Sequence, residues 1–160
     1  MFRLADGLRR FGVIADTHGL LRPEALEALR GSDLILHAGD VGRPEVLAEL
    51  GTLAPLLAVR GNVDRGEWER SLPERQSLAL GTGRLLLLHR RVDAPADPAA
   101  AGYALIVCGH SHQARCESIG GVLYFNPGSA GPRRFRLPVT VGRLVQAETG
   151  WRGEIVELSG

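Results

Sequence analysis

One segment, Gly12-Val13-Ile14-Ala15-Asp16-Thr17-His18-Gly19, introduces a pattern that the rest of the chain repeats. Its first half is a continuous apolar run, as expected of a strand that is covered on both faces. Asp16 and His18 follow at the carboxyl end of this strand, where open α/β sheets bind their ligands. A carboxylate and an imidazole one residue apart can turn toward one point, and together they suit a borderline metal cation.

The first half of the chain repeats this strand-and-ligand unit. Apolar segments over 33–37 and 56–59 end in Gly39-Asp40 and Gly61-Asn62, and helix-like segments begin near Pro23 and Pro44. Proline is favoured in the first turn of a helix because that turn needs no N–H donor there. The order β-α-β-α-β predicts a parallel sheet with right-handed crossovers.

The second half of the chain is richer in strands. We expect strands over 76–80, 84–89, 105–108, 115–119, 122–125, 137–148 and 154–158. Two of them lead into His89 and into His110-Ser111-His112. The segment from Arg90 to Gly102 is too rich in proline for a long helix, which predicts a reduced covering layer there. With no linker or repeat, we expect a lead-in over 1–10 and a single domain over 11–160.

Composition excludes several classes of protein. The 160 residues are 44% hydrophobic and 23% charged, which fits one compact domain. The formal net charge of +1 argues against a nucleic-acid partner for the cluster of Arg133, Arg134 and Arg136. No apolar run is long enough to cross a membrane, and no signal-like segment opens the chain. With two cysteines and no disulfide framework, we expect a reduced, cytoplasmic protein.

Seven residues at strand ends carry metal-competent side chains: Asp16, His18, Asp40, Asn62, His89, His110 and His112. Taken singly, each has a simpler explanation as a helix cap, a turn residue or a structural histidine. Taken together, oxygen and imidazole donors indicate Mn, Fe, Ni or Zn. The remaining histidine, His37, lies inside a strand, so we interpret it as a packed or supporting residue.

A structural zinc site is the competing metal interpretation. It would use Cys108, His110, His112 and Cys116. Such a site needs no carboxylate, so it leaves Asp16, Asp40 and Asn62 unexplained.

The ordered blocks resemble the signature of the calcineurin-like metallophosphoesterase superfamily. They are Gly-x-x-x-Asp-x-His, Gly39-Asp40, Gly61-Asn62, His89 and Gly109-His110-Ser111-His112. Asn62-Val63-Asp64 and Asn126-Pro127-Gly128-Ser129 resemble the small single-domain phosphodiesterase branch, and the resemblance runs from Phe11 to the C-terminus. It implies an α/β fold, a four-layer α/β/β/α sandwich of two mixed sheets with helices on the outer faces.

The resemblance also implies a function and a ligand set. The function is a metal-dependent phosphoesterase, more narrowly a phosphodiesterase, in which a hydroxide bridging two metals attacks the phosphoester. One metal is assigned to Asp16, His18, Asp40 and His112, and the other to Asp40, Asn62, His89 and His110, with Asp40 bridging. Asp40, Asn62 and His110 are the implied catalytic residues. If the segment is extended, His110 and His112 share a side, so that each can face one of two adjacent ions.

The implied cofactors are two divalent transition-metal ions, with Mn expected first and Ni, Fe or Zn as alternatives. The implied partner is a small phosphoester, nucleotides included. Formation of a homodimer through exposed edges of the second sheet remains an open alternative. So does a non-catalytic, protein-binding role, because the same branch contains a retromer subunit.

Two positions depart from the family pattern. Val63 stands where many relatives carry a histidine thought to protonate the leaving group, which favours diesters over unactivated monoesters. Arg90 and Arg91 follow His89 where the branch usually continues with Gly-His. We therefore hypothesise that these arginines, together with Asn62, contact the phosphate of the substrate.

Overall fold

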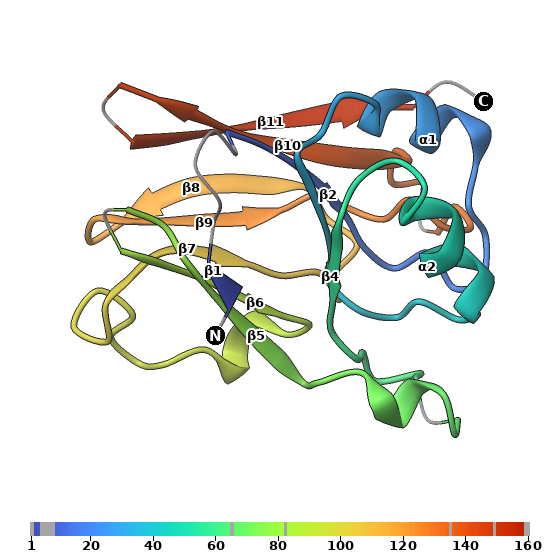
Figure 1. The fold of residues 1–160 in the computed structure, drawn as a ribbon, viewed down its shortest axis with the longest axis horizontal. Helices are drawn as coiled ribbons and strands as arrows, with labels where there is room; N and C mark the ends of the chain where they lie inside the picture. The colour runs from blue at the N-terminus through green and yellow to red at the C-terminus, as the bar shows by residue number, and fades with distance from the viewer. Residues whose placement is uncertain are drawn as a thin grey trace.

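Two mixed sheets pack face to face in the computed structural model, which describes residues 2–3, 9–64, 66–81, 83–134, 136–148 and 150–158 (Figure 1). The five-stranded sheet has the order β11 (Gly150–Glu157), β10 (Thr140–Ala147), β2 (Arg10–Ile14), β3 (Leu34–His37) and β4 (Leu56–Ala58). The six-stranded sheet has the order β1 (Phe2–Arg3), β5 (Arg75–Ala79), β6 (Arg84–Leu88), β7 (Tyr103–Val107), β9 (Val122–Asn126) and β8 (Arg115–Ile119). The predicted two-sheet architecture is confirmed.

Two helices cover the outer face of the five-stranded sheet. They are α1 (Pro23–Leu29) and α2 (Pro44–Leu50), each with proline in its first turn and each connecting parallel strands. Leu29 and Leu50 are fully buried in the apolar cluster that these helices form with Ile35. This is the β-α-β-α-β unit that the sequence predicts.

The six-stranded sheet has a thinner covering on its outer face, as the proline content of the segment after His89 predicts. Within the described residues, the helical structure in this connection is one 3₁₀ turn, η2 (Arg91–Asp93), followed by turns up to Tyr103. The other 3₁₀ turn, η1 (Glu69–Ser71), precedes β5. Of the predicted lead-in, residues 4–8 lie outside the described residues, and Phe2–Arg3 pair in parallel with β5. Among the described helices, none is long and apolar enough to cross a membrane.

The C-terminal hairpin differs from the predicted ranges. β10 begins at Thr140 rather than at 137, because Pro138 cannot donate to a ladder. β11 begins at Gly150, four residues earlier than expected, and Gln146 pairs with Trp151 in this added part. The Trp151 ring stacks on Phe11 with centroids 4.7 Å apart, so this part of the hairpin closes over the start of β2.

Phe125 fills the space between the sheets and depends on two glycines of the hairpin. Its side chain is fully buried. A Cβ atom added at Gly142 would lie 2.4 Å from the Phe125 ring, and one added at Gly153 would lie 2.7 Å from it. The ring therefore packs directly against the backbone of β10 and β11, which fixes the distance between the two sheets.

We predict that Gly142→Ala lowers the free energy of unfolding by about 1–3 kcal/mol, because the added methyl group overpacks the Phe125 ring. Urea denaturation followed by circular dichroism measures the loss. Gly81→Ala is the matched control, since nothing lies within 4 Å of a Cβ atom there. Equal stability of the two variants would contradict this account of the core.

Candidate metal centre

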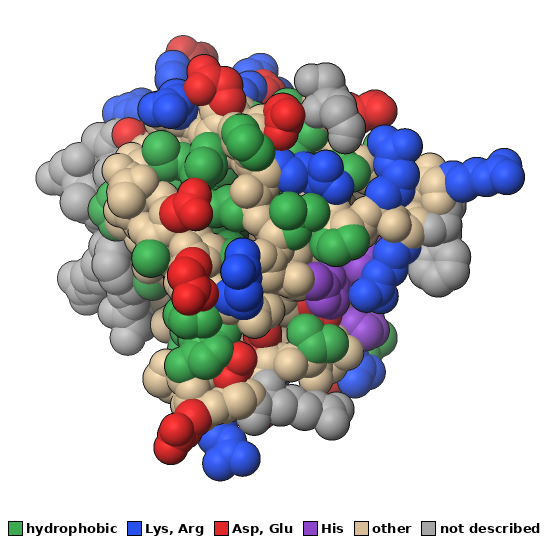
Figure 2. All heavy atoms as spheres, turned by 90° about the vertical axis from the view of Figure 1, so that its right-hand side faces the viewer, with side chains coloured by type: hydrophobic (Ala, Val, Ile, Leu, Met, Phe, Trp, Pro, Cys, Tyr) green, Lys and Arg blue, Asp and Glu red, His purple; other side chains and the backbone are tan. Residues whose placement is uncertain are grey.

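The predicted ligands lie at the carboxyl ends of strands from both sheets. Asp16, Asp40 and Asn62 follow the parallel strands β2, β3 and β4. His89 and His110 follow the parallel strands β6 and β7 of the other sheet. Since parallel strands end at the same edge, the fold brings these loops together. Figure 2 shows histidine side chains at this surface with arginine side chains around them.

The side chains form two groups that could each hold a metal ion. Within each group, one ligand atom from every residue lies within 4.8 Å of the others: Asp16, His18 and His112 in one group, and Asp40, His89 and His110 in the other. In the first, His112 Nε2 lies 3.8 Å from Asp16 Oδ1. In the second, His89 Nε2 lies 3.2 Å from Asp40 Oδ2.

Asp40 links the two groups, and Asn62 belongs with the second. Asp40 Oδ2 also lies 3.8 Å from His18 Nε2, so this one oxygen faces a histidine of each group. Asn62 Oδ1 lies 2.8 Å from His89 Nε2 and 3.2 Å from His110 Nδ1. All seven predicted residues therefore converge at one edge of the molecule.

The route by which His110 and His112 reach their groups differs from the sequence-based expectation. Their φ angles are 71° and 62°, so the segment turns and the extended conformation on which a shared side depended is not formed. Ser111 N donates to Gly109 O at 2.9 Å within this turn. The two histidines nevertheless point to different groups.

Left-handed backbone is common to most of this site. Asp16, His18 and Asp40 also have positive φ angles of 55°, 47° and 56°. For residues with a Cβ atom this conformation costs about 1 kcal/mol or more each. Asp16 N donates to Gly39 O at 3.0 Å and His18 N donates to Asp40 O at 2.9 Å, so neighbouring loops hold the backbone in place.

Two positions next to ligands require glycine because a ligand side chain from another loop packs against their backbone. A Cβ atom at Gly61 would lie 2.2 Å from Asp40 Oδ1, and one at Gly39 would lie 2.6 Å from His89 Nδ1. Both contacts are too short for any side chain. The Gly-Asp and Gly-Asn blocks thus reflect ligands of one loop packed against the backbone of another.

Charge and burial show that the site fits cations. Burial raises the pKa of Asp16 to about 7, against the opposing effect of His89. Asp16 Oδ1 and His18 Nε2 are buried, and no hydrogen-bond partner among the described residues reaches them. A buried carboxylate oxygen and an imidazole nitrogen without partners are costly unless a cation satisfies both. Burial also lowers the pKa of His18, His110 and His112, which favours the neutral, ligating form.

His89 has the orientation of a metal-ligating histidine. Its Nδ1–H donates to Ala38 O at 2.8 Å, which leaves Nε2 facing the oxygens of Asp40 and Asn62. Although burial acts to lower it, the contact with Asp40 raises the pKa of His89. Although burial acts to raise it, the same contact lowers the pKa of Asp40. A ring nitrogen fixed by a carbonyl, with the other nitrogen among oxygens, is typical of metal sites.

Three further residues support the ligand loops, and the sequence alone gave them no role. Asp64 accepts hydrogen bonds from the backbone N–H groups of Val41, Gly42 and Gly61, joining the loops after β3 and β4. Asn126 Nδ2 donates to Gly109 O at 2.9 Å, and Ser129 Oγ donates to Asp16 O at 3.2 Å. Their position in blocks of the family signature was the one available signal.

His37 lies outside both groups, as the sequence suggests. It is fully buried, its Nδ1 accepts from Gly39 N at 3.1 Å, and its Nε2 lies 3.0 Å from Thr17 Oγ1. Burial lowers the pKa of His37 to about 4, so the ring is neutral. Thr17 in turn donates to Val41 O at 2.8 Å, and this chain of bonds ties β3 to the first ligand loop.

The structural zinc interpretation does not hold. Cys108 is buried and Cys116 is exposed on β8, and neither cysteine belongs to a candidate metal group in the described part of the chain. The histidines that this interpretation borrowed belong instead to the two groups with carboxylates.

Comparisons with known proteins agree with this geometry. The model of the calcineurin-like phosphoesterase superfamily domain matches residues 10–149. A probable metallophosphoesterase of Methanothermobacter thermautotrophicus is 36% identical over 149 residues, covering 86% of this chain and 86% of the relative.

Two solved structures show the same fold. That of a novel archaeal phosphodiesterase is 22% identical, with a TM-score of 0.75, and covers 92% of this chain and 99% of its own. Vps29 of Chaetomium thermophilum is 20% identical, with a TM-score of 0.73, and covers 94% of this chain and 98% of its own. The metal-competent edge, the family match and the archaeal relative lead to one conclusion: the chain belongs to the calcineurin-like phosphoesterase superfamily.

Proposed function

We propose that this protein is a phosphodiesterase with a dinuclear metal site, in which water hydrolyses a phosphodiester to a monoester and an alcohol. The observation that carries the proposal is the pair of ligand groups with Asp40 between them and with unpartnered atoms on Asp16 and His18. A protein-binding role alone would not require two groups of metal-competent side chains at one edge. Mixed oxygen and imidazole donors favour Mn, with Ni, Fe and Zn as alternatives.

The metal ions and the ligand residues would have different roles at the reacting phosphate. When bound, two divalent cations supply a hydroxide nucleophile near neutral pH and neutralise charge on the phosphoryl oxygens. Asp40 presents one oxygen toward both groups, while His110 belongs to the second group and Asn62 contacts its two histidines. We therefore assign Asp40, Asn62 and His110 to the immediate surroundings of the substrate.

Val63 favours diesters as substrates. Its side chain is about half exposed beside Asn62 and carries no proton to transfer. Without an acid at this position, esters with a stable leaving group are the better substrates. The structural neighbour described as an archaeal phosphodiesterase supports this choice.

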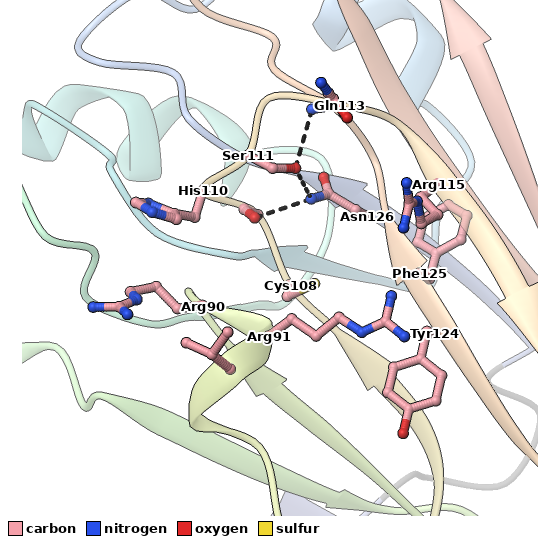
Figure 3. Close-up of a pocket in the computed structure, with 12 residues that line it drawn as sticks. Arg90, Arg91, Cys108, His110, Ser111, Gln113, Arg115, Tyr124, Phe125 and Asn126 are labelled. Carbon is pink, nitrogen blue, oxygen red and sulfur yellow. Dashed lines mark hydrogen bonds between the residues drawn. The ribbon is translucent and has the colours of Figure 1, made fainter. Parts of the chain in front are cut away.

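We assign the phosphate contact to Arg90 rather than to Arg91. Arg91 Nη1 donates to Glu117 Oε1 at 2.6 Å, and its guanidinium lies 4.1 Å from the centre of the Tyr124 ring. Arg90 is exposed, and its contact with Asp93 is 3.8 Å long. Arg90 and His110 line the same pocket, and the Arg90 side chain extends on the His110 side of it (Figure 3).

We predict that metal-stripped protein hydrolyses bis(p-nitrophenyl) phosphate only after Mn²⁺ is restored. Asp40→Asn should lower kcat/KM at least about 100-fold, because it removes an oxygen shared by both ligand groups. Release of p-nitrophenol measures both effects. Asp97→Asn, on an exposed turn, is the matched control. Full activity of Asp40→Asn would refute the dinuclear proposal.

We predict that Mn²⁺ stabilises the protein more at about pH 8 than at about pH 5. The pKa of Asp16 is raised in the metal-free protein, so protonation of this carboxyl group stabilises the fold. This stabilisation is fully present below the ordinary pKa of 3.8. That contribution is lost as the pH rises through about 7, where a bound cation replaces the proton. Thermal unfolding with and without Mn²⁺ measures the difference. An equal Mn²⁺ effect at both pH values, or one unchanged by Asp16→Asn, would contradict the assignment.

We predict that Arg90→Ala raises KM for the diester about tenfold, because it removes a charge-assisted hydrogen bond to the phosphate. Arg30→Ala is the matched control. Like Arg90, Arg30 is exposed and paired with an acid three residues away, but it lies at the end of α1. Steady-state kinetics measures KM, and an unchanged KM in Arg90→Ala would remove this contact from the proposal.

A further inference from the structure

A pocket of about 330 Å³ opens beside His110 (Figure 3). The segment Arg90–Val92 forms one wall, and the loop after β7 together with β9 forms the other. Of the candidate metal ligands, His110 is the one that lines it. A substituent on a phosphate held at the second ligand group therefore has this pocket next to it, and the function proposed above gives the pocket no role.

The pocket combines apolar side chains with arginines. Val92 stands at the rim with 76% of its surface exposed, and Cys108 lies at the bottom. Arg91 extends toward Tyr124, and its guanidinium lies 4.1 Å from the centre of that ring. Aromatic rings and guanidinium planes are the surfaces on which flat aromatic ligands stack.

The arginines that line the pocket differ in how far they are engaged. Glu117 accepts from Arg91 at 2.6 Å and lies 3.7 Å from Arg115, so one carboxylate contacts both arginines. Arg90, in contrast, extends on the side of His110 (Figure 3). The pocket thus offers one cation near the metal ligands and, away from His110, the guanidinium plane of Arg91, which Glu117 and Tyr124 hold in place.

We propose that this pocket binds the aromatic ring of one ester substituent, a nucleobase in the simplest case, while the phosphate lies between Arg90 and the ligand groups. The proposal rests on the proposed function and narrows its substrates to nucleoside-type phosphodiesters. The volume is at the lower end of that of small-molecule sites, which suits a single ring system rather than a long chain. Recognition comes from stacking between Val92 and the Arg91–Tyr124 pair.

Calorimetric titration of the Mn²⁺-loaded protein tests the pocket without turnover. Thymidine 5′-monophosphate and 2-deoxyribose 5-phosphate share the phosphate and the sugar and differ in the base. We expect the base to lower Kd at least about tenfold, the effect of stacking one base. Val92→Trp and Gln113→Trp, which fill the pocket from opposite exposed rims, should abolish the difference. Ile119→Trp, an exposed apolar position on β8 away from the lining, should retain it.

The possible outcomes separate this proposal from the proposed function. Equal Kd values for the two ligands in the unmodified protein would overturn the pocket proposal, as would a difference that survives in both tryptophan variants. A base-dependent Kd that both variants abolish supports it, whether or not diesters are hydrolysed. Absence of Mn²⁺-dependent diester hydrolysis alongside that result would reject the phosphodiesterase function and retain the nucleotide site.

Discussion

The site has to compensate the burial of two carboxylates, Asp16 and Asp40. Their side chains are 0% and 4% exposed and lie at the junction of the two sheets. Each acid faces a histidine of its own group and also one of the other group: Asp16 lies 4.0 Å from His89, and Asp40 lies 3.8 Å from His18. Removing an ionised carboxylate from water costs several kcal/mol unless charge or hydrogen bonds replace the lost hydration. Histidines, backbone N–H groups and glycines without a Cβ atom surround both acids for this reason.

Rigid strands bring the ligands to the site, but hydrogen bonds between loops give them their orientation. Asp64 connects the loops that carry Asp40 and Asn62, and Asn126 holds the turn that carries His110. These supporting groups stabilise backbone conformations that are unfavourable for residues with side chains. A site of this kind is preorganised by its surroundings, which lowers the cost of ordering it when a ligand arrives.

Sequence patterns were sufficient for the strands from β2 to β9, for the residue types at their ends and for the helices that begin at proline. The convergence of the ligands follows from parallel strands ending at one edge, a general property of such sheets. The left-handed turn at His110 could not be predicted, since it depends on Asn126, which lies 16 residues further along the chain. The pairing of Arg91 with Glu117 and the early start of β11 at Gly150 likewise depend on contacts between distant segments.

Each acid at this edge has one oxygen already engaged by the backbone. Asp16 Oδ2 accepts from His110 N at 3.1 Å, and Asp40 Oδ1 accepts from Val63 N at 3.0 Å. The other oxygen of each carboxylate, Asp16 Oδ1 and Asp40 Oδ2, is the one that faces the histidines. A cation held here would therefore take one well-placed oxygen from each acid, and water or a phosphoester would complete its coordination.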